Sequence, residues 1–309
     1  MANFTKNRYF FELIGQVTCT ASLHGDFFLY SLAALNIFLS MTASLGNILI
    51  LVALRKESSL HPQSKLLFRC LALTDLFVGV FAQPLFTVQL MSIAHQRLQL
   101  CYIVANINDI AGRSLIAVSL CTLTAISVDR LLVLLLGLRY RQKVTLRRMR
   151  GTVISMWILN IALSSCLRLL SRAIISWVTS ALIYTLLVTS AFCYMKIYLS
   201  LRYHEVEMQD HVHQGQRNRG GIPLNIARYR KTVSAALWVQ LTLVACYLPY
   251  GIAAPIAHPY TSSNNLFTRL TLTLLLLNSS LNPFLYCWKM RGVRQAMKET
   301  IKQLCSCSC

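Results

Sequence analysis

The stretch FFLYSLAALNIFLSMTASLGNILILVAL, residues 27–54, decides the fold of this chain. It continues for 28 residues without a charged side chain. About 20 predominantly apolar residues suffice for a helix to cross the hydrocarbon layer of a membrane. Backbone amides in lipid must be satisfied within their own segment. The stretch therefore predicts a membrane-spanning helix and excludes a core helix of a water-soluble protein.

Six further apolar runs follow, and with the first they predict an all-α bundle of seven membrane-spanning helices. The expected spans are residues 27–54, 70–94, 98–138, 151–167, 173–195, 232–257 and 270–288. The third run is too long for one upright crossing, so we expect it to tilt or to project from the membrane. The bundle then occupies residues 27–288, between an extracellular tail of residues 1–26 and a cytoplasmic amphipathic, Cys-rich segment of residues 289–309.

The composition agrees with a membrane protein. Charged residues make up 13% of the chain, against about 25% in soluble globular proteins. The formal net charge of +20 would by itself fit a nucleic acid, an anionic membrane face or an acidic protein as partner. The basic residues lie in short loops between apolar runs and not on one basic domain, so we expect no nucleic acid as a partner.

The basic residues also predict the orientation of the chain. The loop after the third run carries no acid and contains Arg139, Arg141, Lys143, Arg147, Arg148 and Arg150. Loops rich in Lys and Arg face the cytoplasm. We therefore expect a multi-pass protein of the plasma membrane with its N-terminus outside. Asn3, in the triplet Asn3-Phe4-Thr5, is then a candidate for glycosylation.

The segment after the seventh run has the pattern of an amphipathic helix on the membrane surface. Its apolar residues recur every three or four positions, at Met290, Val293, Met297, Ile301 and Leu304. The candidates for palmitoylation beside this helix are Cys305, Cys307 and Cys309. The alternative of unmodified, reduced thiols stays open.

Polar residues and prolines occur inside the apolar runs in a particular order. They include Gly46-Asn47 in the first run, Asp75 in the second, Asp129-Arg130 at the end of the third, Tyr194 in the fifth, Pro249 in the sixth and Asn282-Pro283-Phe284-Leu285-Tyr286 in the seventh. Polar groups are costly inside a membrane, so each is a functional candidate. From Gly46 to about Cys305, this order resembles the rhodopsin-like (class A) G-protein-coupled receptors.

The resemblance implies a receptor, and not an enzyme, that binds an extracellular ligand and activates heterotrimeric G proteins by outward movement of the sixth helix. It also implies arrestin as a cytoplasmic partner, and an arginine that pairs with the adjacent acid in the resting state. The residues implied in coupling and switching are Asp129, Arg130, Tyr194, Tyr247, Pro249, Asn282, Pro283 and Tyr286. The rival class is a seven-helix transporter or channel, although the internal repeats of many transporters are not visible in the sequence.

Asp75 lies in the middle of the second run, where an isolated carboxylate tends to take up a proton. By resemblance, a family sodium site would be formed by Asp75, Ser119, Asn278, Ser279 and Asn282. Sodium is thus expected as an allosteric ligand, and no cofactor is required. The alternative of a protonated Asp75 hydrogen-bonded to Asn47 and Asn282 stays open.

The chain departs from the family pattern at positions that bear on switching. Tyr229 stands where the family often has an acid that holds the motif arginine, so we expect raised ligand-independent activity. Tyr247 replaces the common Trp below the ligand pocket. Ala105 stands in place of a Cys, so we expect the family's usual disulfide to be missing, although Cys101 could still bond Cys19. These departures resemble the melanocortin, cannabinoid, lysophospholipid and adenosine receptor group.

The ligand pocket is expected near the start of the third run. Gly112 replaces the Asp of the family's amine receptors and Leu276 replaces the opsin lysine, so we expect neither a small amine nor covalently bound retinal. The pocket candidates are Asn108, Asp109, Gly112, Arg113 and Tyr247. Asp109 and Arg113 are four residues apart on one helix face and can form an ion pair. The pair either only orients helices or anchors the polar head of a small molecule, a lipid or a peptide.

Overall fold

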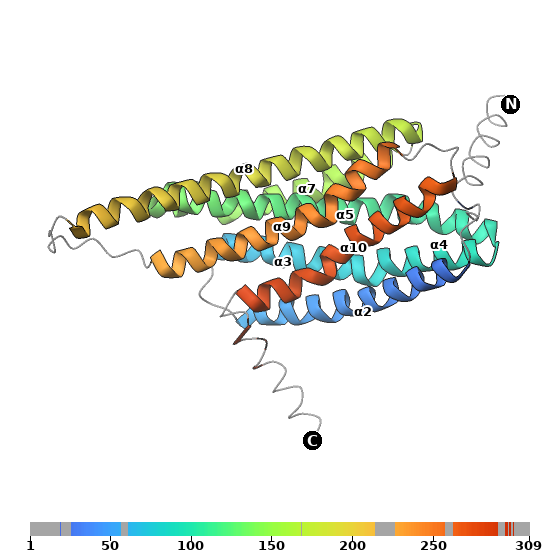
Figure 1. Ribbon diagram of the computed structural model, residues 1–309, viewed down its shortest axis with the longest axis horizontal. Coiled ribbons are helices and arrows are strands. Elements are labelled where there is room, and N and C mark those ends of the chain that lie inside the picture. The colour runs from blue at the N-terminus through green and yellow to red at the C-terminus, as the bar shows by residue number, and fades with distance from the viewer. Residues whose placement is uncertain are drawn as a thin grey trace, which may run out of the picture.

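The computed structural model describes residues 19, 26–56, 61–167, 169–213, 226–256, 262–289, 294, 295, 297 and 299, and the described chain forms helical rods lying side by side (Figure 1). The helices are α2 (Asp26–Lys56), α3 (Pro62–Phe77), α4 (Gln83–Ala94), α5 (Leu98–Leu136), α6 (Tyr140–Lys143), α7 (Leu146–Leu167), α8 (Arg172–His213), α9 (Ile226–Ile256) and α10 (Ser262–Lys289). A wider π-helical turn, η1 (Val78–Ala82), joins α3 and α4 into one rod. Since α6 is a single turn, the described residues form seven long rods, as the sequence predicts.

Several helices do not end where the apolar runs end. α8 continues to His213 and α9 begins at Ile226, whereas the runs predict 195 and 232. Apolar length reports only the part of a helix that lipid surrounds, and charged residues can continue a helix into water. The third helix ends at Leu136 and not at 138, because Gly137 adopts a φ of 48°, a left-handed conformation that favours glycine.

Five described helices are long and apolar enough to cross a membrane, judged by length and composition. They are Asp26–Lys56, Pro62–Ala94, Leu98–Leu136, Leu146–Leu167 and Ala173–Ser200. α9 adds a shorter apolar helix, Gln240–Ile256. The middle of α10 is less apolar because it carries Asn278, Ser279, Ser280 and Asn282, all of which are buried. These side chains face protein, so they do not oppose a crossing.

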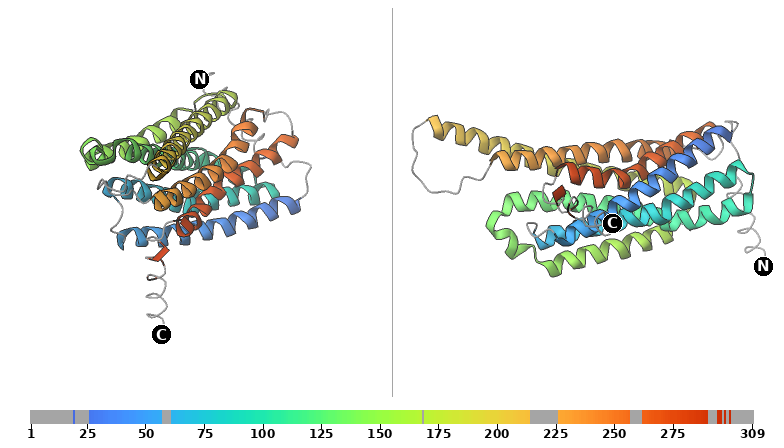
Figure 2. Two further views of the ribbon diagram at one scale, coloured as in Figure 1. Left: turned by 60° about the vertical axis from the view of Figure 1, so that its left-hand side comes forward. Right: turned by 90° about the horizontal axis from the view of Figure 1, so that it is seen from below.

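Neighbouring rods close into a ring. Contacts run from α2 to α3 and α4, then to α5, α8, α9 and α10, and α10 packs back against α2. α7 lies outside this ring, against α5 and α3 (Figure 2). Large apolar side chains such as Trp177, Val188 and Phe284 are 63–68% exposed on the surface of the bundle. This inside-out distribution suits contact with lipid.

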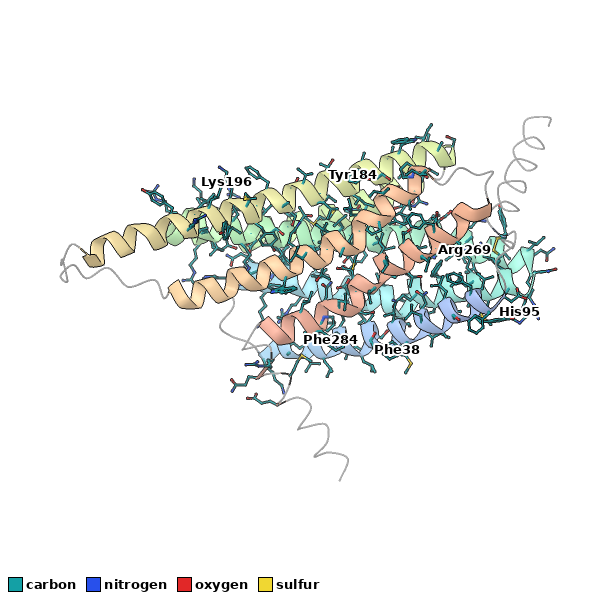
Figure 3. All side chains as sticks on the ribbon, in the orientation of Figure 1. Phe38, His95, Tyr184, Lys196, Arg269 and Phe284 are labelled. Atoms are coloured by element: carbon teal, nitrogen blue, oxygen red, sulfur yellow. A yellow bond between two sulfur atoms is a disulfide. The ribbon has the colours of Figure 1, made fainter. Side chains whose placement is uncertain are left out.

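A disulfide joins Cys19 to Cys101 near the start of α5, with 6.1 Å between the Cα atoms (Figure 3). The pairing that the sequence left open is therefore formed. We call this end of the bundle the disulfide end. The opposite end, which carries Arg139, Arg141 and Lys143, is called the basic end.

The interior contains two apolar clusters. The cluster toward the basic end includes Ile50, Leu67, Leu71, Leu123 and Leu243. The cluster toward the disulfide end includes Leu32, Val78, Phe86, Cys101 and Leu276. Asp75 is fully buried between Leu71 and Val78 on the same rod. The core is thus divided by a polar centre, around which the candidate site is built.

Candidate functional site

A cavity of about 160 Å³ lies in the half of the bundle toward the disulfide end. Its walls come from α5, α7, α8, α9 and α10, and they are largely aliphatic, with Ile116, Leu163, Leu182, Leu186, Leu272 and Leu276 among them. All five predicted pocket residues line it, namely Asn108, Asp109, Gly112, Arg113 and Tyr247. The sequence did not identify the other polar lining residues, Asn160, Ser164, Thr179 and Tyr250, or the apolar walls, because both depend on the helix packing.

The predicted ion pair in this cavity is present. Arg113 Nη2 lies 3.4 Å from Asp109 Oδ1, and Arg113 Nε donates to the Asp109 carbonyl at 3.1 Å. The side chain of Asp109 is 55% exposed and that of Arg113 25%. Gly112 makes room for the side chain of Asn108, because a Cβ there would lie 2.3 Å from Asn108 Oδ1. The cavity's carboxylate is thus already paired with a cation.

The polar centre of the bundle is organised by Asp75. Ser119 and Ser279 donate to Asp75 Oδ1 at 3.0 and 2.8 Å, and Asn282 Nδ2 donates to Oδ2 at 2.7 Å. Four of the five predicted sodium-site residues therefore meet. Asn278 is buried, but it does not bond Asp75, and its Nδ2 makes no hydrogen bond.

The alternative partner of Asp75, Asn47, bonds elsewhere. Its Nδ2 donates to the carbonyl oxygens of Ala43 at 2.8 Å and Ser279 at 3.1 Å. Asn47 therefore joins α2 to α10 beside the polar centre without bonding the carboxylate. Of the two predicted amide donors, only Asn282 bonds Asp75.

Tyr247 connects the cavity with the polar centre. It lines the cavity, is 1% exposed, and its phenol lies beside Ser119, which donates to Asp75 Oδ1 at 3.0 Å. Tyr247 is thus shared by the cavity and the surroundings of the polar centre. Its role in switching stays a prediction.

The proline of the seventh-helix motif packs closely against α2. A Cβ at Gly46 would lie 2.8 Å from Pro283 Cγ, so this contact requires glycine. Pro283 and Pro249 lie inside α10 and α9, where each removes one backbone hydrogen bond. The side chain of Tyr286, the last residue of the motif, lies outside the described residues.

A second buried polar chain, which the sequence reading missed, joins three helices toward the basic end. The hydroxyls of Ser127 on α5 and Ser190 on α8 are 2.8 Å apart, and Ser190 donates to Gln240 Oε1 on α9 at 2.5 Å. Their exposed fractions are 2%, 0% and 8%. We call these three residues the serine–glutamine relay. A glutamine inside an apolar run was the available signal, but its partners depend on the helix register.

The Asp129-Arg130 motif takes an unexpected arrangement at the basic end. Asp129 accepts hydrogen bonds from Ser64 Oγ at 2.7 Å and Tyr140 Oη at 2.5 Å. Arg130 instead lies over the Phe68 ring, 5.4 Å from its centroid. The ion pair among the described residues is Arg113–Asp109, and the expected pairing of Asp129 with Arg130 is not formed in this structure. Two hydroxyl donors already satisfy the carboxylate.

Tyr140 is suited to remain a donor to Asp129. It is 2% exposed and lies in the short helix α6. Burial raises its pKa well above the usual value, and the hydrogen bond to Asp129 raises the pKa further. The phenol therefore stays protonated and keeps its hydrogen bond at physiological pH.

The remaining predicted residues are described only in part. Tyr194 is buried on α8, and Leu131 and Leu134 pack against its cluster. Met297 packs partly buried against the apolar cluster toward the basic end, as expected for the apolar face of a surface helix. The side chain of Tyr229 and the modification candidates Asn3, Cys305, Cys307 and Cys309 lie outside the described residues.

The chain matches one known protein family. The family model described as 7 transmembrane receptor (rhodopsin family) matches residues 46–173 and 166–286. The matched residues extend from the Gly46–Pro283 contact to the last residue of the seventh-helix motif. They include the cavity, the polar centre and the Asp129-Arg130 motif.

Proposed function

We propose that this chain, which belongs to the rhodopsin family of 7 transmembrane receptors, binds an extracellular ligand in its cavity and activates heterotrimeric G proteins. The observation that carries the proposal is the place of Tyr247. It lines the cavity and lies beside Ser119, which donates to Asp75. Asp75 in turn accepts a hydrogen bond from Asn282, which precedes Pro283. Tyr247 thus lies between a ligand in the cavity and the polar centre around Asp75. Asn282 connects this centre to α10, whose hydrogen bonding Pro283 interrupts.

The conformational step in this proposal is an outward movement of the end of α9 that lies toward the basic end. Pro249 weakens α9 where a bend can form. On the basic-end side of Pro249, Gln240 ties α9 to α8 through Ser190. Outward movement must break this bond, after which Arg130 and its neighbours become available to the G protein. Arrestin would use the same face.

The proposed orientation places the disulfide end outside the cell and the basic end in the cytoplasm of a plasma-membrane receptor. Disulfides persist in oxidising, extracellular surroundings and are rare in the cytosol. Loops rich in Lys and Arg face the cytoplasm. The Cys19–Cys101 bond and the cluster of Arg139, Arg141 and Lys143 lie at opposite ends, so both rules favour the same orientation.

We also propose sodium as an allosteric ligand of the polar centre. The donor set fits this ion, because Asp75 offers a carboxylate and Ser119 and Ser279 offer hydroxyl oxygens within 3.0 Å of it. A cation there would favour the charged form of Asp75 in an otherwise apolar core. These residues would hold the ion and thereby join α5, α10 and the α3 rod.

The test is agonist-independent G-protein activation in cells, compared between the wild type and Arg130→Gln. We expect activation above that of receptor-free cells, with loss of most of this signal in the variant. Arg55→Gln is the control, since Arg55 is an exposed arginine in the last turn of α2 and has no proposed role in coupling. Equal signals in the presence and absence of the receptor, at verified surface expression, contradict the proposal. A transporter would instead show solute flux sensitive to Asp75→Asn.

A further inference from the structure

Arg269 on α10 is a buried cation without a counter-charge among the described residues. Its exposed fraction is 8%, and its Nη1 makes no hydrogen bond. A guanidinium cannot shed its proton at physiological pH. A charge removed from water is unfavourable unless it is paired. Arg269 is therefore poised for an anionic partner.

Other unsatisfied polar groups lie on α2, which packs against α10, and on α4, which packs against α2. Asn36 on α2 donates to Thr273 Oγ1 at 3.1 Å, and Thr273 in turn donates to the Arg269 carbonyl at 3.0 Å. Arg269 is one turn from Thr273 on the same face of α10, so it lies on the side that packs against α2. Asn36 Oδ1 and both side-chain polar atoms of Gln83, which is fully buried, have no hydrogen-bond partner.

Arg269 is also adjacent to the cavity. Leu272 and Leu276, three and seven residues further along α10, both line the cavity. At 1.5 Å per residue they lie about 4.5 and about 10 Å from Arg269 along the helix axis. In Figure 3, Arg269 lies toward the disulfide end of the bundle. An elongated ligand in the aliphatic cavity can thus extend one end to this guanidinium.

The charges in the cavity and beside it favour an acidic ligand over a basic one. Asp109, its carboxylate, is already paired with Arg113. Arg269 has no such partner among the described residues. We propose that the ligand is an anionic amphiphile whose apolar part occupies the cavity and whose carboxylate or phosphate group pairs with Arg269. This inference rests on the proposed receptor function and specifies its ligand class.

The test measures thermal stability of the purified receptor in phosphatidylcholine nanodiscs, which add no anionic headgroup. The probes are decanoate, decyl phosphate and decanol. We expect one or both anionic probes to raise the Tm saturably, and decanol to give no saturable rise. The response to decanoate against decyl phosphate distinguishes a carboxylate from a phosphate ligand.

The variants isolate the guanidinium. Arg269→Gln should weaken the apparent affinity for the active probe at least tenfold, and Arg269→Lys should retain part of it. Arg97→Gln is the matched control, because Arg97 is an exposed arginine at the N-terminus of α5 near the same end. Without any probe, Arg269→Gln should keep the Tm of the wild type or raise it, since it removes an unpaired buried charge.

Three results would overturn the inference: no response of the wild type to either anion, equal responses of wild type and Arg269→Gln, or a Tm lowered by Arg269→Gln without a probe. The last result would show that the cation already has an internal partner. Basal G-protein activation measured on the same variants separates the two proposals. If it depends on Arg130 while the anions have no effect, the receptor function stands and the ligand class is wrong.

Discussion

Replacing Ser190 with alanine should raise ligand-independent signalling. Ser190 is fully buried, and its hydroxyl contacts both Ser127 at 2.8 Å and Gln240 at 2.5 Å. These contacts hold α9 against α8 and α5. Because the end of α9 toward the basic end must leave α8 on activation, the substitution removes the bond between Ser190 and Gln240, which only the resting state makes.

The size of the effect follows from the number of bonds that are lost. Hydrogen bonds between side chains inside membrane proteins contribute about 0.6 kcal/mol each on average. Loss of the bond between Ser190 and Gln240 therefore shifts the equilibrium by about 0.6 kcal/mol. This corresponds to a roughly threefold rise in the ratio of active to resting receptor.

The assay is agonist-independent G-protein activation at matched surface expression. Ser165→Ala is the control, because Ser165 is exposed on α7 and its hydroxyl bonds only the Ile161 carbonyl of its own helix. Gln240→Leu should raise the signal in the same direction, and the double variant should add little, since both changes break one network. Unchanged or lower signalling in Ser190→Ala would refute the assigned role of the relay.

Three further predictions test other parts of the structure. Gly46→Ala should lower the stability of the purified receptor by about 1–3 kcal/mol because its Cβ meets Pro283. The control Gly151→Ala, with open space around it, should leave the Tm unchanged or raise it. Equal Tm values of the wild type and Gly46→Ala would contradict the close contact. Asp75→Asn should abolish the rise in Tm that sodium chloride gives over choline chloride, and a rise retained in this variant would argue against the sodium site. Cys101→Ser should lower stability by about 2–4 kcal/mol and reduce surface expression. If a reducing agent leaves the melting curve of the wild type unchanged, the bond is not formed.

The sequence predicted the seven rods well because apolar length is a local property. The run of residues 27–54 needs no knowledge of its neighbours to be identified as a spanning helix. The extension of α8 to His213 could not be predicted in this way, because the hydrocarbon layer no longer constrains the composition beyond the membrane. The pocket candidates on α5 were predicted because they are polar or replace family residues near the start of an apolar run, and only the pairing of Asp109 with Arg113 followed from helical spacing.

The parts that were missed depend on contacts between helices. The partners of Asp129 come from α3 and α6, and the sequence gives no register that would place Ser64 and Tyr140 beside it. The same holds for Ser190 and Gln240, which are 50 residues apart. Arg269 lies one residue outside the predicted seventh span, 270–288, and only the packing of α10 against α2 revealed that it is buried.

The disulfide has a mechanical consequence for how this receptor can respond. Cys19 and Cys101 are 82 residues apart, and the loop that their bond closes contains α2, α3 and α4. The disulfide therefore links these helices and the start of α5 covalently, and they cannot separate far at the disulfide end. α8, α9 and α10 are held to this covalently closed segment by packing and hydrogen bonds. We expect the helices closed by the disulfide to keep their relative positions when a ligand binds, and α8, α9 and α10 to move against them. Ligand binding would then change mainly the position of α9.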